Sequence, residues 1–198
     1  PQTRHQLIYP AVPEAPRAAG RDIIIVASDN YGNYASLRWF LTEVVPLAGD
    51  ARVAIYGNID GGVKRRDASL YEAHRALFKG RVADIGAVYA NAGCILLPTT
   101  EGHGLSIKAV EALSSGAPLV ATPLAFRGMQ IDPTRLGNVT LADTAADFAE
   151  KWRAAQARAD AGALPPAESD TRRIYEQVFS PQAYARTLAE TVRTLELP

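Results

Sequence analysis

The chain has 198 residues, of which 47% are hydrophobic, and its 21 lysines and arginines balance its 21 aspartates and glutamates. This length supports one sizeable core, and the neutral charge argues against nucleic-acid binding as the main function, because such binding depends on an excess of basic side chains. The single cysteine, Cys94, excludes an internal disulfide framework and fits a reducing compartment. It stands in an apolar run, where a small core residue is the expected role.

No stretch of the sequence approaches the ~18 consecutive apolar residues of a membrane span, and its start lacks the apolar core of a signal peptide. We therefore expect a cytoplasmic protein, with the inner face of a membrane as an alternative position for the full-length protein. His5, His74 and His103 show no ligand-like spacing, so we expect no metal.

The first 21 residues contain Pro10, Pro13 and Pro16, and a core strand begins only at Asp22. Prolines at this density interrupt regular structure and are typical of a linker. We interpret residues 1–21 as an interdomain linker, which implies that another domain precedes it.

Strand and helix patterns then alternate along the chain. Residues 23–27 form a continuous apolar run that suits a central parallel strand, and apolar residues recur at three- and four-residue spacing over 37–45, with Asn33 as the expected N-cap of that helix. The predicted elements that follow are a strand over 52–57, a loop over 58–62, a helix over 69–77, a brief strand and turn over 78–82, a helix capped by Asp84 and ending at 90, a strand over 93–98, a helix over 107–113, and strands over 118–122 and 139–141.

The C-terminal part has a different pattern. Residues 145–163 and 169–195 are polar and amphipathic, which predicts helices. Pro165-Pro166 interrupts them, and so does Ser180-Pro181, which we interpret as a helix cap followed by a proline at the first helical position.

Strands that are apolar on both faces and alternate with helices predict a three-layer α/β/α sandwich with a mostly parallel sheet. Ligands of such sheets bind at the carboxyl edge of the strands, where the loops after residues 27, 57 and 98 are rich in Gly, Asn and Asp. We assign residues 22–165 to this domain, and residues 166–198 to helices that pack on it or on a preceding domain.

The turn over residues 102–106 joins a buried strand to a helix and contains two glycines. At such a junction the first backbone N–H groups of the helix lack intrahelical acceptors and the helix dipole is positive, so an anion finds donors there. Lys108 and Glu111 stand one turn apart near that helix end. A cation suits a phosphate and a carboxylate suits a sugar hydroxyl, so the motif indicates a nucleotide-linked ligand.

Residues 104–123, GLSIKAVEALSSGAPLVATP, resemble the donor-site signature of the group 1 (family 4) glycosyltransferases with the GT-B fold. The resemblance extends over about residues 22 to 195 and covers only the C-terminal, Rossmann-like half of such an enzyme. It implies that this half binds the nucleotide-sugar, that a missing N-terminal half binds the acceptor, and that the proline-rich start is the linker between them.

The resemblance also implies roles for single residues. Glu111 matches the second glutamate of the E-x7-E motif of the family, which accepts hydrogen bonds from the ribose hydroxyls. Lys108 is expected to neutralise phosphate charge or, equally, to form a surface ion pair with Glu111. The remaining matches are Gly104, Leu105 and Ser106, whose backbone would meet the diphosphate or the sugar, Gly32 and Asn33 in the other phosphate-facing loop, and Arg81 and Val82 beside the base.

The sequence departs from the family pattern at two places. His103 stands where many retaining members carry the first glutamate, and the nearest carboxylate, Glu101, lies two residues earlier. We expect His103 to donate a hydrogen bond to a sugar hydroxyl or to the β-phosphate. Where many members use an Arg and a Lys to clamp the diphosphate, this chain offers Asn30, Asn33 and Arg38, and Arg127 is a further cation near the motif.

The implied activity is transfer of a sugar from a nucleotide-diphosphate-sugar to a saccharide or lipid acceptor, with retention and without a metal or other cofactor. Two alternatives stay open, namely a catalytically silent nucleotide-sugar-binding module and a sugar 2-epimerase of the same two-domain architecture. A nucleotide-dependent oxidoreductase is disfavoured, because residues 28–32 contain no G-x-G-x-x-G turn.

Overall fold

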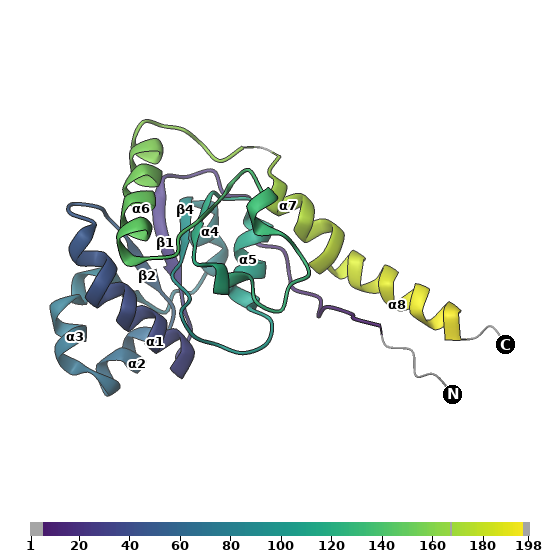
Figure 1. Cartoon of the computed structure of the whole chain (residues 1–198), viewed down its shortest axis with the longest axis horizontal. Coiled ribbons are helices and arrows are strands. Elements are labelled where there is room, and N and C mark those ends of the chain that lie inside the picture. The colour runs from purple at the N-terminus through teal and green to yellow at the C-terminus, as the bar shows by residue number, and fades with distance from the viewer. Residues whose placement is uncertain (1–5, 167, 196–198) are drawn as a thin grey trace.

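Within residues 6–166 and 168–195, which the computed structural model describes, six parallel strands form one sheet in the order β3-β2-β1-β4-β5-β6 (Figure 1). This confirms the predicted sheet, and all five neighbouring pairs in it are parallel. Strands β1 to β3 lie on one side of the β1/β4 boundary and β4 to β6 on the other, so this boundary is the topological switch point. The strands are β1 (Asp22–Val26), β2 (Ala54–Tyr56), β3 (Phe78–Gly80), β4 (Ala92–Leu97), β5 (Leu119–Ala121) and β6 (Val139–Leu141).

One face of the sheet carries an aromatic core. Phe40, Phe148 and Trp152 are fully buried there, and the ring centroids of Phe40 and Trp152 lie 5.3 Å apart. Truncating a buried aromatic side chain typically costs about 3–5 kcal/mol, so this cluster fixes the helices to the sheet. The helical segments of this layer are α1 (Tyr31–Trp39) with its π-helical continuation Phe40–Val44, α2 (Ile59–Arg66), α3 (Ala68–Ala73) and α6 (Ala145–Asp160).

The other face is covered by α4 (Ile85–Ala90) and α5 (Ile107–Ser115). Helix α5 presents buried alanine, valine and leucine side chains to the sheet, as the helical spacing in the sequence predicts. It ends at Gly116, whose φ of 73° is the left-handed conformation that glycine adopts without strain. Helix α5 thus begins after β4, at the carboxyl edge of the sheet, and ends at this cap.

The proline-rich start is irregular, as expected, but it is packed on the domain. Val12, Ala15 and Ala18 are buried against the α5 side of the sheet. The Val12 N–H donates to the Phe179 carbonyl at 3.1 Å, and Glu14 forms an ion pair with Arg172. Residues 6–21 are therefore held along the domain, and their connection to a preceding domain stays a prediction.

Two local predictions in the first half were wrong. Asn30, not Asn33, caps α1: its side chain accepts the Asn33 N–H at 2.8 Å, so the helix begins at Tyr31. Helix α2 forms where we expected a loop over residues 58–62. Glycines disfavour a helix, but Gly62 is required here, because a Cβ at this position would lie 2.1 Å from the Asp29 carboxylate.

The predicted C-terminal helices are α7 (Asp170–Ile174), with a π-helical continuation Tyr175–Phe179, and α8 (Pro181–Leu195). The Ser180 hydroxyl accepts the Ala183 N–H at 3.1 Å, which confirms the predicted cap.

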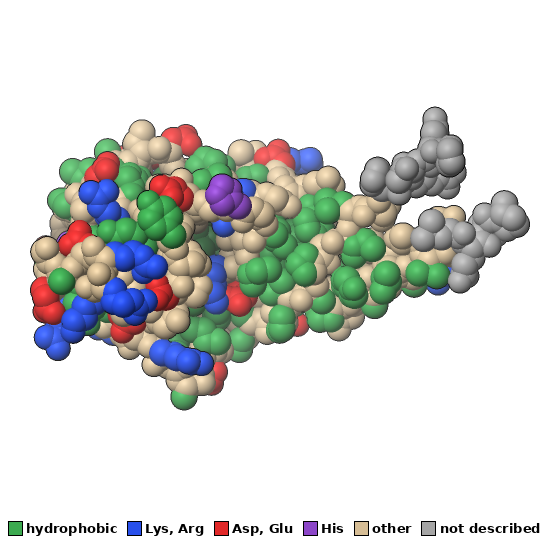
Figure 2. Space-filling view, turned by 90° about the horizontal axis from the view of Figure 1, so that it is seen from below, with side chains coloured by type: hydrophobic (Ala, Val, Ile, Leu, Met, Phe, Trp, Pro, Cys, Tyr) green, Lys and Arg blue, Asp and Glu red, His purple; other side chains and the backbone are tan. Residues whose placement is uncertain are grey.

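Helix α7 packs on α5, whereas α8 projects from the body of the molecule (Figure 1). Hydrophobic side chains lie along this projection (Figure 2), and Tyr184, Leu188 and Val192 are 38–42% exposed. In the part of the chain described, no helix has the length and apolar character to cross a bilayer.

Candidate functional site

Three adjoining clefts follow the carboxyl edge of the sheet, and Figure 2 shows the hollowed face with basic side chains beside it. The central cleft, of about 460 Å³, lies at the β1/β4 switch point between residues 25–28 and 96–99. A second cleft of about 460 Å³ extends toward β2 and β3, and shares Ser28 and Lys108 with the first. A third of about 340 Å³ extends the other way, and shares His103 and Arg127 with the first.

The clefts bring together most of the residues that the sequence singled out. Gly104 and Glu111 do not line a cleft but stand next to residues that do. In the central cleft lie Asn33, His103, Leu105, Ser106 and Lys108; in the cleft toward β2 and β3 lie Arg81, Val82 and Lys108; in the third lie Gly32, Asn33 and His103.

The turn before α5 has an open backbone. Gly102 and Gly104 have φ values of 140° and 64°, which other residues adopt only with strain. Nothing lies within 4 Å of the place where a Cβ of Gly104 would stand, so this stretch of backbone is accessible. Ser106 caps the helix, accepting the Ala109 N–H at 3.4 Å. The predicted strand–turn–helix junction is therefore present, with the first amides of α5 beside the central cleft.

Glu111 is held by two neighbours. Its Oε2 accepts a hydrogen bond from the Tyr89 hydroxyl at 3.0 Å and an ion pair from Lys108 at 2.9 Å. Of the two expectations for Lys108, the ion pair is therefore formed. The Oε1 atom has no hydrogen-bond partner among the described residues, and it remains an acceptor for a ligand hydroxyl.

Tyr89 is a site residue that sequence reasoning missed. It lies on α4, 22 positions before Glu111, and only the packing of α4 on α5 brings the two together. Burial, reinforced by the charge of Glu111, raises the pKa of Tyr89, so its hydroxyl stays a donor. Burial also raises the pKa of Cys94 to about 12, which makes that thiol an inert core group, as its apolar run indicated.

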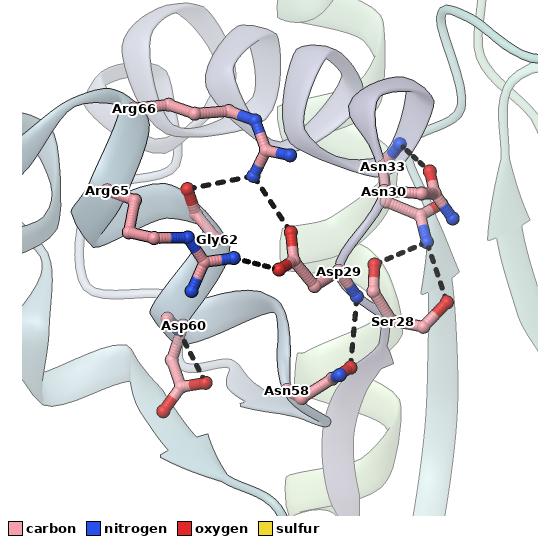
Figure 3. Close-up of polar contacts among 10 residues, drawn as sticks. Ser28, Asp29, Asn30, Asn33, Asn58, Asp60, Gly62, Arg65 and Arg66 are labelled. Atoms are coloured by element: carbon pink, nitrogen blue, oxygen red, sulfur yellow. Dashed lines mark hydrogen bonds and ion pairs between the residues drawn. The ribbon is translucent and has the colours of Figure 1, made fainter.

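The β1–α1 loop, residues 27–30, is closed by contacts with the first turn of α1, with α2 and with Asn58 (Figure 3). The Asp29 carboxylate pairs with Arg66 at 2.8 Å and with Arg65, and its backbone N–H donates to the Asn58 side chain at 2.9 Å. The Arg66 hydrogen bond, followed by that of Arg65, holds the pKa of Asp29 below its ordinary value. The two arginines of α2 thus share Asp29 as their ion-pair partner.

Asn33, in the first turn of α1, closes the same loop. Its side-chain amide donates to the Ser28 carbonyl at 2.8 Å, and its backbone N–H is taken by Asn30 (Figure 3). The side chain that the resemblance places opposite the phosphates is therefore already hydrogen-bonded within the loop.

Ser36 connects the closed loop to the open turn, and nothing in the sequence distinguished it. Its hydroxyl donates to the Gly32 carbonyl at 2.7 Å and accepts the Thr100 N–H at 3.1 Å. The start of α1 and the end of β4 are thereby fixed relative to each other across the switch point.

His103 and Arg127 border the clefts on the side away from Arg81. His103 is exposed. Arg127 is partly buried, and its Nε is fully buried without a hydrogen-bond partner. Arg38, the other cation considered from the sequence, is exposed on α1 and lines none of the three clefts. In the described part of the chain no three His, Cys, Asp or Glu side chains group as metal ligands would, and His5 lies outside that part.

The sequence model of the family "Glycosyl transferases group 1" matches residues 20–156, well over half of the chain. The chain belongs to this family. A search of curated proteins finds no match to the sequence. The family assignment confirms the resemblance carried by residues 104–123 and agrees with the cleft at the switch point.

Solved structures of glycosyltransferases share the fold. TarM from S. aureus is 19% identical over 92% of this chain and 37% of its own, with a TM-score of 0.63. HepE from Anabaena, in complex with UDP, is 14% identical over 89% and 49%, with a TM-score of 0.64. The C-terminal domain of LpcC, a group 1 family protein from Francisella tularensis, is 15% identical over 88% and 97%, with a TM-score of 0.55.

At these identities the likeness shows the fold alone. The group 1 chain spans less than half the length of TarM and HepE but nearly all of the LpcC domain. It therefore has the Rossmann-like fold of the C-terminal half of a GT-B glycosyltransferase, as the sequence predicted.

Proposed function

We propose that the chain is the donor-binding half of a glycosyltransferase that moves a sugar from a nucleotide-diphosphate-sugar to a saccharide or lipid acceptor with retention. One observation carries the proposal: Glu111, with a free Oε1, stands one turn inside α5, whose open N-terminus borders the central cleft. A helix N-terminus suits a diphosphate, and a carboxylate one turn on suits the ribose attached to it.

The clefts follow one another in the same order as the base, the diphosphate and the sugar of such a donor. The cleft toward β2 and β3, with Arg81 and Val82, would hold the base, and the central cleft the diphosphate. Lys108 lines both clefts, and would stand between base and phosphates. The complex of HepE, which shares this fold, with UDP supports a nucleotide as the ligand.

Transfer requires that negative charge on the leaving diphosphate be stabilised while the anomeric carbon becomes cationic. The amides of Gly104, Leu105 and Ser106, with Lys108, would supply part of this stabilisation. His103, exposed at the junction of the central and third clefts, would donate a hydrogen bond to the sugar or the β-phosphate, where many family members place a glutamate.

The acceptor would bind through a second domain. The chain spans less than half of TarM and HepE, and the exposed stripe of Tyr184, Leu188 and Val192 on α8 gives such a domain an apolar surface to cover. A lipid-linked acceptor would place the full-length protein at the inner face of a membrane.

Isothermal calorimetry of the chain with UDP, GDP, ADP and CDP, without added metal, tests donor binding. We expect one of them to bind at a single site and the matching free nucleoside to bind more weakly. Absence of heat with all four diphosphates, for a chain shown to be folded by its thermal transition, would overturn the proposal.

The silent-module alternative is favoured by His103 at the glutamate position, and a turnover assay separates the two. The chain is joined to the coding sequence that precedes it and given the diphospho-sugar of the nucleotide that binds. Sugar transfer or donor hydrolysis that Glu111→Ala abolishes supports an enzyme, and its anomeric configuration, read by NMR, tests retention. Binding without any turnover supports the silent module, and a released sugar inverted at C2 supports the epimerase.

A further inference from the structure

The proposed donor carries two phosphates, and most cations at the carboxyl edge already have a partner. Arg65 and Arg66 are paired with Asp29, and Lys108 is paired with Glu111. Arg81 lies in the cleft proposed for the base. The phosphate end of the site therefore depends on backbone amides and on whatever cation the other side of the central cleft provides.

Arg127 is that cation. It lines both the central cleft and the third cleft, beside His103, but not the cleft that contains Arg81. Among the residues described it forms no ion pair with a carboxylate, and the one hydrogen bond of its side chain is from Nη1 to the Leu124 carbonyl at 3.3 Å. With the base in the cleft that contains Arg81, the distal phosphate would lie at the opposite end of the site. The guanidinium of Arg127 stands at that end.

Two glycines position this arginine. A Cβ on Gly102 would lie 2.4 Å from Nη2 of Arg127, so the glycine lets the guanidinium pack directly against the turn. A Cβ on Gly128 would lie 3.1 Å from the Leu105 nitrogen, so the backbone after Arg127 runs against the same turn. The guanidinium and the amides before α5 are thus parts of one packed unit.

The surroundings of Arg127, among the residues described, hold no counter-charge for its guanidinium. Its Nε is buried and makes no hydrogen bond, and burial lowers the pKa of Arg127. A partly desolvated cation without a counter-charge is unfavourable, whereas a phosphate would supply both charge and a bidentate acceptor.

We propose that Arg127 binds the β-phosphate of the donor and stabilises it as a leaving group, in place of the loop cations that the β1–α1 segment lacks. This inference rests on the proposed donor-binding function. The β-phosphate would then lie on the β5 side of the central cleft, where Arg127 meets the turn before α5.

Calorimetry with UDP and UMP, or with the diphosphate and monophosphate of whichever nucleoside the chain prefers, tests the assignment. In Arg127→Gln we expect the diphosphate to bind roughly tenfold to a hundredfold more weakly, the loss of a charge-assisted contact. The monophosphate should be affected much less, because it lacks the β-phosphate. Arg38→Gln, which removes an exposed cation outside the clefts, is the matched control and should change neither affinity.

Equal weakening of diphosphate and monophosphate, or no weakening of either, would contradict the role of Arg127. If Arg127→Gln lacks the wild-type thermal transition, Arg127→Lys takes its place: it keeps the charge but loses the planar fork, so it should still lower diphosphate affinity selectively. Unchanged diphosphate affinity in Arg127→Lys would then overturn the assignment. A wild-type chain that binds no diphosphate fails earlier, at the proposed function, and the inference fails with it.

Discussion

The β1–α1 loop and the β4–α5 turn lie opposite each other at the switch point, yet they are built in opposite ways. In the first, Asp29 and Asn33 engage the surrounding arginines and backbone groups, so the loop is held by contacts with α1 and α2. In the second, Gly104 keeps the backbone open, and Arg127, packed against Gly102, lacks a counter-charge among the described residues. Ser36 connects the two.

The difference indicates a division of labour across the cleft. A loop whose polar groups are already satisfied gains little from a ligand, and serves as a rigid wall. A turn with free amides beside an uncompensated cation gains most when an anion binds. We therefore expect recognition of the donor to depend on the β4–α5 side, and the following changes test that expectation.

Glu111→Ala should have the largest effect. Loss of the carboxylate removes the acceptor for the ribose, and because hydrogen bonds to charged groups contribute about 1.5–3 kcal/mol each, we expect roughly a hundredfold loss of nucleotide affinity. Calorimetry measures it, with Glu150→Ala on the exposed surface of α6 as the control. Equal affinities of the two variants would remove Glu111 from the site.

The same glycine-to-alanine substitution on the two sides of the switch point should have opposite results. Gly102→Ala places a methyl group against the guanidinium at a φ of 140°, so we expect a loss of about 1–3 kcal/mol in unfolding free energy and weaker diphosphate binding. Gly32→Ala lies in α1 with its nearest neighbour at 3.4 Å, so it should be neutral or stabilising by less than about 1 kcal/mol. Urea unfolding compares them, and similar losses in both would contradict the contrast between the two sides.

Tyr89→Phe should have a moderate effect. It removes the hydroxyl that orients Oε2 of Glu111 but keeps the buried ring and the Lys108 ion pair. We expect a loss of about 1 kcal/mol, or roughly fivefold in nucleotide affinity, with the thermal transition nearly unchanged. Tyr71→Phe, away from the three clefts, is the matched control. A change in affinity no larger than in that control would show that Glu111 is positioned without Tyr89.

Asp29→Asn should have the smallest effect, on stability rather than on binding. Because Arg66 and Arg65 lower the pKa of Asp29 in the folded state, its stabilisation is present above the ordinary carboxyl value of 3.8 and is lost as the pH falls through the lower folded value. Melting temperatures of wild type and variant should therefore differ at pH 6 and converge in acid below pH 3.8. A difference that grows in acid would contradict the ion pair.

The sequence predicted the sheet, the order of most elements and the junction before α5, because each depends on local patterns: apolar runs, helical spacing, and glycines between strand and helix. It failed at α2, where the glycines of residues 58–62 suggested a loop. There Gly62 leaves room for the side chain of Asp29, and the two residues are more than thirty positions apart in the sequence. It also failed at Asn33, because either of two asparagines fitted the cap and only the backbone path selects Asn30.

By itself, then, the sequence determined the fold class, the family resemblance and the place of Glu111 at the start of a helix, since those are written in neighbouring residues. Only the tertiary structure decided which charges are free. Tyr89 contacts Glu111, and Arg65 and Arg66 pair with Asp29, whereas Arg127 has no carboxylate partner among the described residues. These pairings follow from how helices and loops pack across the sheet edge. Electrostatic pairing depends on distance in space, which the order of residues along the chain does not specify.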